Sequence, residues 1–126
     1  MRESQTRGMH QKDDRGRAGE DRAVRHLRRR GYRILDRNWR VAGGEIDIVA
    51  SRMGVLVICE VKTRSSTAYG HPFEAIDAAK LGRLWRLARA WKVTHPRHHG
   101  VLRVDAIAVI GKDPRTAVVE HLRDLR

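Results

Sequence analysis

Apolar residues recur at helical spacing in two parts of the chain. Over residues 15–30 they form one stripe, made of Ala23, Val24 and Leu27, and Gly31 supplies a C-terminal stop. A longer helix is predicted from about Phe73 to Val93, opened by Pro72 and interrupted near Asp77–Lys80. Its apolar stripe consists of Leu81, Leu84, Trp85, Ala88 and Trp91.

Strand-like patterns fill the remaining apolar segments. β-branched and alternating runs predict strands at Tyr32–Arg40, Glu45–Ala50, Val55–Lys62, Val101–Ile110 and Thr116–His121, with Ile46, Ile48 and Ala50 on one face of the second. The order is therefore helix, three strands, helix, two strands, which is typical of a mixed α/β domain. Residues 1–14 are polar and aperiodic, so we expect a disordered tail followed by a single domain over 15–126.

Two carboxylates and a lysine lie on the two central strands. Side chains alternate along a strand, so Glu60 and Lys62 point the same way. If Ala50 pairs with Val55 across residues 51–54, Asp47 faces Ile58, and Glu60 is its diagonal neighbour on the same face. Such neighbours lie about 7–8 Å apart, whereas a slip of one residue would place the acids on opposite faces.

The spacing of these residues suits phosphoryl chemistry. Mg²⁺ keeps several waters, so two carboxylates and a substrate phosphate suffice to hold it. A lysine beside the metal ligands can position water or neutralise developing charge. Glu20 falls in line with the apolar stripe of its helix. It is either a glutamate favoured by the helix dipole or a third acid that reaches the metal site.

The charge balance points to an anionic partner. The 126 residues carry a net charge of +12, with 22 Arg and 5 Lys, and guanidinium groups suit phosphate. Residues 17–31 have net charge +4 and residues 80–98 net +6, while most carboxylates lie between them. We therefore expect the two basic helices to form the walls of a cleft around the carboxylates.

Several classes of protein are excluded by composition. No apolar run approaches the ~18–20 residues of a transmembrane helix, and the polar N-terminus is unlike a secretory signal. The single cysteine, Cys59, excludes an internal disulfide framework, so we expect a cytoplasmic protein without a membrane partner and a core role for Cys59. Asp105 interrupts an apolar strand, which predicts a structural partner among nearby arginines.

The motifs together resemble a known family. Residues 44–50 (GEIDIVA) and 57–64 (VICEVKTR) resemble the PD-(D/E)XK, or restriction-endonuclease-like, superfamily. Within it the chain is similar to the YraN-like family of small bacterial proteins, with further agreement at residues 19–20 (GE), 31–35 (GYRIL), 37–40 (RNWR), 70–72 (GHP), 74–76 (EAI) and Lys80. Ile46 stands where the superfamily motif has proline, a widespread departure.

The resemblance implies a restriction-endonuclease-like α/β fold, a central mixed β-sheet flanked by α-helices. It implies Mg²⁺ or Mn²⁺ bound by Asp47, Glu60 and the carbonyl of Val61, with Lys62 catalytic. Glu20 would match a helix glutamate of the archaeal Holliday-junction resolvases, which are homodimers acting on branched DNA. Candidate nucleic-acid contacts are Arg40, Arg64, Lys80 and Arg83.

Besides a ribosome- or RNA-associated basic protein, two functions remain open from the sequence. The first is a metal-dependent endonuclease that hydrolyses DNA phosphodiester bonds. The alternative is a non-catalytic module that binds DNA or RNA, in which the acids serve only as ion-pair partners.

Overall fold

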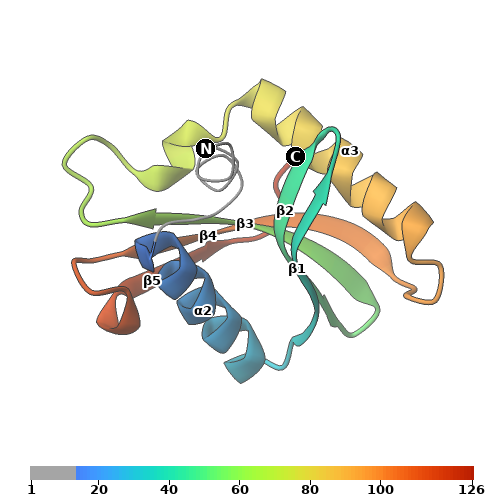
Figure 1. The fold of residues 1–126 in the computed structure, drawn as a ribbon, viewed down its shortest axis with the longest axis horizontal. Helices are drawn as coiled ribbons and strands as arrows, with labels where there is room; N and C mark the ends of the chain where they lie inside the picture. The colour runs from blue at the N-terminus through green and yellow to red at the C-terminus, as the bar shows by residue number, and fades with distance from the viewer. Residues whose placement is uncertain (1–13) are drawn as a thin grey trace, which may run out of the picture.

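A five-stranded mixed sheet organises residues 14–126, the part of the chain that the computed structural model describes (Figure 1). The strands follow chain order across the sheet, and every neighbouring pair is antiparallel except the parallel pair β3–β4. Their bounds are β1 Arg33–Val41, β2 Gly44–Arg52, β3 Val55–Arg64, β4 Val101–Ile110 and β5 Val118–Leu122. Two α-helices, α2 (Asp14–Arg29) and α3 (Ala78–Thr94), and two 3₁₀ turns, η1 (Pro72–Ala75) and η2 (Pro114–Thr116), complete the fold.

The two α-helices cover opposite faces of the sheet. Along β3, Leu56 and Ile58 pack in one apolar cluster with α3, while Val57 and Cys59 pack in the other with α2. The expected central mixed sheet flanked by helices is therefore confirmed, as is the core position of Cys59. The expectation that both basic helices wall one cleft is wrong, because helical periodicity identifies an apolar stripe but not the side of the sheet that it covers (Figure 1).

The β2–β3 hairpin has a tighter turn than expected. Arg52 pairs with Val55, so the turn consists of Met53 and Gly54, both with positive φ (49° and 81°). The predicted pairing of Ala50 with Val55 is therefore wrong by two positions. A shift of two keeps every side chain on its face, so Asp47 and Glu60 remain on the same side.

Alternation along β2 is interrupted near its start. Ile48 and Ala50 belong to the α2-side cluster, but Ile46 belongs to the α3-side cluster, so the prediction of all three on one face is wrong. The neighbouring strand β1 contains Asn38, whose φ of 54° breaks the regular pleat there. Asn38 lies between Arg37 and Trp39, which pair with Ile48 and Ile46, and therefore stands across from Asp47.

The predicted interruption of the second helix is confirmed. Pro72 opens the short turn η1, and α3 begins only after Asp77, whose carboxylate accepts a hydrogen bond from the Lys80 N–H at 2.8 Å. The buried residues of α3 are Leu84, Leu87, Ala88 and Trp91. The predicted tail, residues 1–14, lies outside the described residues except for Asp14, where α2 begins. None of the described helices is both long enough and apolar enough to cross a membrane.

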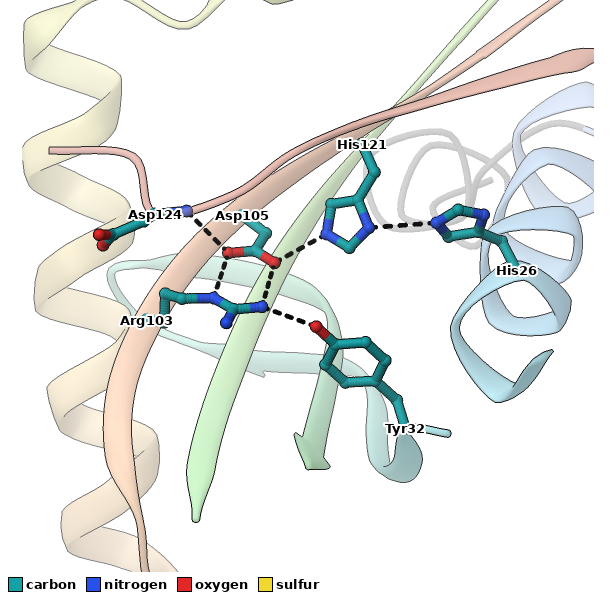
Figure 2. Close-up of polar contacts among 6 residues, drawn as sticks. All are labelled: His26, Tyr32, Arg103, Asp105, His121 and Asp124. Atoms are coloured by element: carbon teal, nitrogen blue, oxygen red, sulfur yellow. Dashed lines mark hydrogen bonds and ion pairs between the residues drawn. The ribbon is translucent and has the colours of Figure 1, made fainter. Parts of the chain in front are cut away.

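A buried charged network ties the C-terminal segment to the sheet (Figure 2). Asp105 is fully buried, and its carboxylate accepts two hydrogen bonds from Arg103, one from His121 at 2.7 Å and one from the Asp124 N–H. Arg103 also donates to the Tyr32 hydroxyl, so the predicted arginine partner of Asp105 is confirmed. Burial raises the pKa of Asp105, but the hydrogen bonds from His121 and Arg103 outweigh it and hold that pKa below its ordinary value.

Candidate metal centre

A cavity of about 320 Å³ lies where β2 and β3 stop pairing, beneath the N-terminal half of α3. The last paired residues are Ile48 and Cys59, and continuing that register would set Asp47 opposite Glu60. Both acids are largely buried, at 6% and 8% exposure. The residues that line the cavity are Gly44, Glu45, Asp47, Glu60, Val61, Lys62, Lys80, Arg83, Leu84 and Leu87. The structure thus brings the predicted Asp47, Glu60, Val61 and Lys62 to one cavity.

The backbone of Val61 joins the two carboxylates. Its N–H donates a hydrogen bond to Asp47 Oδ2 at 2.8 Å, in the position where a strand partner would otherwise accept it. The N–H and C=O of one strand residue point to the same edge of the strand, since paired residues exchange both bonds with one neighbour. The carbonyl of Val61 therefore faces the same gap between β2 and β3 as the Asp47 carboxylate.

Two lysines neutralise Glu60. Lys80 Nζ lies 2.9 Å and Lys62 Nζ lies 3.4 Å from the same oxygen, Glu60 Oε2. Burial, followed by the neighbouring ammonium of Lys80, lowers the pKa of Lys62. For Lys80 the hydrogen bond and charge of Glu60 outweigh burial and raise the pKa. The sequence suggested Lys80 only as a nucleic-acid contact; its contact with Glu60 depends on where α3 is placed.

Gly44 allows the β1–β2 hairpin to lie close to α3 at one wall of the cavity. A Cβ at this position would lie 3.3 Å from Leu87 Cδ1 and 3.8 Å from the Arg83 side chain, and its φ of 139° disfavours other residues. The hairpin can therefore approach α3 closely, and Glu45 and Arg83 both line the cavity. Arg40, the neighbouring candidate, lies 3.3 Å from Glu45 in an ion pair.

Glu20 and Arg64 lie outside this cavity. Glu20 is buried in the second turn of α2, where its Oε1 accepts a hydrogen bond from Asn38 at 3.1 Å and lies 3.5 Å from Arg37. That position does not fit the alternative of a first-turn glutamate favoured by the helix dipole. Because Asn38 stands across from Asp47, Glu20 contacts the strand that supports the carboxylate pair. Arg64 lines a separate cavity beyond Lys62.

The donor set fits a hard divalent cation. Two carboxylates and a backbone carbonyl are oxygen donors, the kind that Mg²⁺ and Mn²⁺ prefer, and Mg²⁺ completes its shell with water. Among residues 14–126 no group of three or more His, Cys, Asp or Glu side chains is arranged to hold a metal. Any cation in this cavity would therefore depend on the carboxylate pair, on Val61 and on ligands from solvent or substrate.

Known proteins align with almost the whole described chain. The model of Uncharacterised protein family UPF0102 matches residues 19–109. A UPF0102 protein of Arthrobacter sp. (strain FB24) is 54% identical over 115 residues, covering 91% of this chain and 98% of its own. One from Renibacterium salmoninarum is 51% identical over 124 residues, covering 93% and 99%.

Among solved structures, an XisH family protein from Nostoc punctiforme is similar with a TM-score of 0.45 and 14% identity, covering 83% of this chain and 98% of that one. The extent of the family match and the identities of the relatives agree with the sequence resemblance. The chain belongs to Uncharacterised protein family UPF0102, the YraN-like family that its motifs indicated.

Proposed function

We propose that this protein is a divalent-metal-dependent endonuclease that hydrolyses phosphodiester bonds in DNA. One observation carries the proposal: two largely buried carboxylates, Asp47 and Glu60, face a single cavity together with the ammonium groups of Lys62 and Lys80. Acids are rarely buried beside an anion-binding surface unless they have chemistry to perform or a charge to hold. A Mg²⁺ or Mn²⁺ ion satisfies both requirements.

The residues of the cavity would have separate roles in hydrolysis. Asp47, Glu60 and the Val61 carbonyl would hold the ion, which supplies positive charge to the phosphoryl oxygens and acidifies water. Lys62, which pairs with Glu60, would hydrogen-bond the attacking water or a phosphoryl oxygen. Water adds to phosphorus, the bond to one ester oxygen breaks, and the departing oxygen takes up a proton.

Basic residues around the cavity would bind the DNA backbone. Lys80 and Arg83 line the cavity itself, and Arg40 forms an ion pair with Glu45, which also lines it. Contacts of this kind release counterions, so binding weakens steeply as salt rises. Sequence-specific recognition is not part of the proposal, because these groups contact phosphates rather than base edges.

The alternative function, a non-catalytic nucleic-acid-binding module, also has an observation in its favour. Lys80 and Lys62 both approach Glu60 Oε2, which is the arrangement expected if the acid served only as an ion-pair partner. Against it stands the burial of Asp47 in the same cavity, where its carboxylate accepts a hydrogen bond from the Val61 N–H. A module that only binds phosphate gains little from two acids beside its ligand.

The test is cleavage of a panel of substrates. Linear duplex, flapped and four-way DNA and single-stranded RNA are incubated with the full chain and Mg²⁺ or Mn²⁺, with EDTA as the metal-free arm. The variants are Asp47→Asn and Glu60→Gln, and the matched control is Asp113→Asn, which removes an exposed acid paired with Arg115.

We expect metal-dependent cleavage of at least one DNA by the unaltered chain and the Asp113 variant, and a loss of at least about 100-fold in both site variants. Gel filtration of the same samples checks the homodimer that the resemblance implied. Binding without metal-dependent cleavage of any substrate would establish the non-catalytic alternative. Cleavage that survives both site variants would place the chemistry elsewhere.

A further inference from the structure

A second cavity lies beyond the end of β3 and shares no lining residue with the first. The chain leaves β3 at Arg64, runs through a loop of residues 65–71 and returns to the sheet at η1 (Figure 1). Between loop and turn is a space of about 380 Å³, whose polar and aromatic walls include Arg64, Ser65, Ser66, Tyr69, His71 and Glu74. The proposed function does not use this cavity.

Tyr69 stands at the rim of this second cavity with its side chain fully exposed. Several hydrogen bonds hold the loop that carries it. The Gly70 N–H donates to the Thr67 carbonyl at 3.0 Å, and the Ala68 N–H donates to Ser66 Oγ at 3.2 Å. His71 accepts from the Phe73 N–H and pairs through Nε2 with Glu120 at 2.7 Å. An ordered loop therefore presents an aromatic ring to water.

A nucleic-acid strand that passes over the carboxylate cavity along β3 would continue to the second cavity. Alternation along β3 puts Arg64 on the same face as Glu60 and Lys62. The distance along the strand from Glu60 to Arg64 is about 13 Å at about 3.3 Å per residue. That is about four steps of a stacked nucleic-acid strand at 3.4 Å each. A nucleic-acid strand held at the carboxylates would thus reach the loop of residues 65–71 within a few nucleotides.

The walls of the second cavity suit a nucleobase better than a phosphate. Glu74 repels phosphate, but its carboxylate can accept hydrogen bonds from the amino group of a base. The Glu74 carboxylate lies against the backbone of Gly70, which has no Cβ. A Cβ there would be 2.6 Å from Glu74 Oε1. An exposed tyrosine ring stacks on any base, and such stacking is the main contribution of aromatic residues to single-strand binding.

We propose that this cavity binds an unpaired base a few nucleotides from the cleaved bond, with Tyr69 stacking on the base, Glu74 accepting from it and Arg64 pairing with the adjoining phosphate. The inference rests on the proposed function for its place along the substrate. A duplex hides the faces of its bases within the stack. The preferred substrate is therefore DNA with a single-stranded or splayed nucleotide within a few nucleotides of the scissile phosphate.

The test compares single-stranded and duplex binding in EDTA, where no cleavage occurs. A fluorescein-labelled single-stranded DNA 20-mer of mixed sequence and the same 20-mer annealed to its complement are titrated with the full chain, and anisotropy is read. The variants are Tyr69→Ala and Tyr69→Phe. The matched control is Met53→Ala, which removes another highly exposed apolar side chain, at the opposite end of β3.

We expect Tyr69→Ala to weaken single-strand binding about tenfold, with duplex binding changed less than about twofold. Tyr69→Phe and Met53→Ala should bind both DNAs as the unaltered chain does. Single-strand binding that is unchanged in Tyr69→Ala, or that falls equally for the duplex, would overturn the inference and leave the nuclease proposal standing. If Tyr69→Ala loses single-strand binding while the unaltered chain cleaves no substrate, the base cavity stands and the nuclease proposal fails.

Discussion

Removal of the Asp105 carboxylate should destabilise the protein far more than removal of a similar exposed carboxylate. Asp105 has no exposed surface, and its two oxygens accept four hydrogen bonds, two of them from Arg103, two residues earlier in the chain (Figure 2). In Asp105→Ala the guanidinium of Arg103 and the ring of His121 lose their buried acceptor. Loss of one partner from a buried pair destabilises a protein by about 3–5 kcal/mol.

Asp113 provides the matched control. It also accepts two hydrogen bonds from the guanidinium of an arginine two residues away, Arg115, and one from the Arg115 N–H, but both side chains are exposed to water. Water replaces such a partner readily, so Asp113→Ala should cost only about 1 kcal/mol, mainly from the lost cap of η2. The comparison therefore isolates burial, since the acid and the spacing of its arginine partner are alike.

Urea unfolding followed by circular dichroism measures the difference. With an m-value of about 1.5–2 kcal/mol/M, Asp105→Ala should lower the unfolding midpoint by about 1.5–3 M, and thermal unfolding should shift by roughly 10–20 °C. Asp105→Asn keeps the shape and should fall between, which provides a folded variant if alanine is not tolerated. Equal midpoints for the Asp105 and Asp113 variants would refute the account of this network.

Three further predictions concern buried or paired groups. Burial, and then the charge of His121, lower the pKa of His26 to about 4. As the pH decreases from 6.5 to 4, His26 therefore takes up a proton in the unfolded chain but not in the folded chain, and the free energy of unfolding falls by at most about 3 kcal/mol. In urea unfolding, His26→Gln should reduce this pH dependence. Lys80→Gln should strengthen Mn²⁺ binding about fivefold in calorimetry, because the ion no longer displaces a lysine from Glu60; weaker binding would contradict the geometry. Cys59 is buried with a raised pKa, so its reaction with iodoacetamide should be at least about 100-fold slower in the folded than in the unfolded chain, and rapid labelling would disprove its core position.

Elements governed by local signals could be predicted closely. The strand Val101–Ile110 has the bounds that its mostly apolar run indicated. The break before α3 follows from Pro72, which suits a first turn, and from Asp77, which caps the helix with its own carboxylate. In each case the controlling residue lies within the element or directly beside it.

The hairpin register could not be predicted, because its turn uses an unfavourable residue. A two-residue turn with positive φ at both positions favours Asn or Asp before Gly, and this chain has Met53 there. The wrong register still placed Asp47 and Glu60 on one face, since the error was an even number of residues. The same-face prediction therefore depended on parity rather than on the turn.

The placement of helices over the sheet was also beyond the sequence. Both α2 and α3 are basic and amphipathic, and nothing in their periodicity says that they cover opposite faces. That placement separates the two basic surfaces and brings Lys80 to Glu60. It is also why Glu20, on α2, contacts Asn38 rather than the cavity that Lys80 lines.

Calorimetric titration of Mn²⁺ into the full chain tests the central claim, that Asp47 and Glu60 hold one divalent cation, most directly. The unaltered protein and the Asp113→Asn control should each bind one ion per chain in the carboxylate cavity, and Asp47→Asn and Glu60→Gln should each weaken that binding at least about tenfold. Equal Mn²⁺ affinity in all four proteins would contradict the assignment of this cavity as a metal centre.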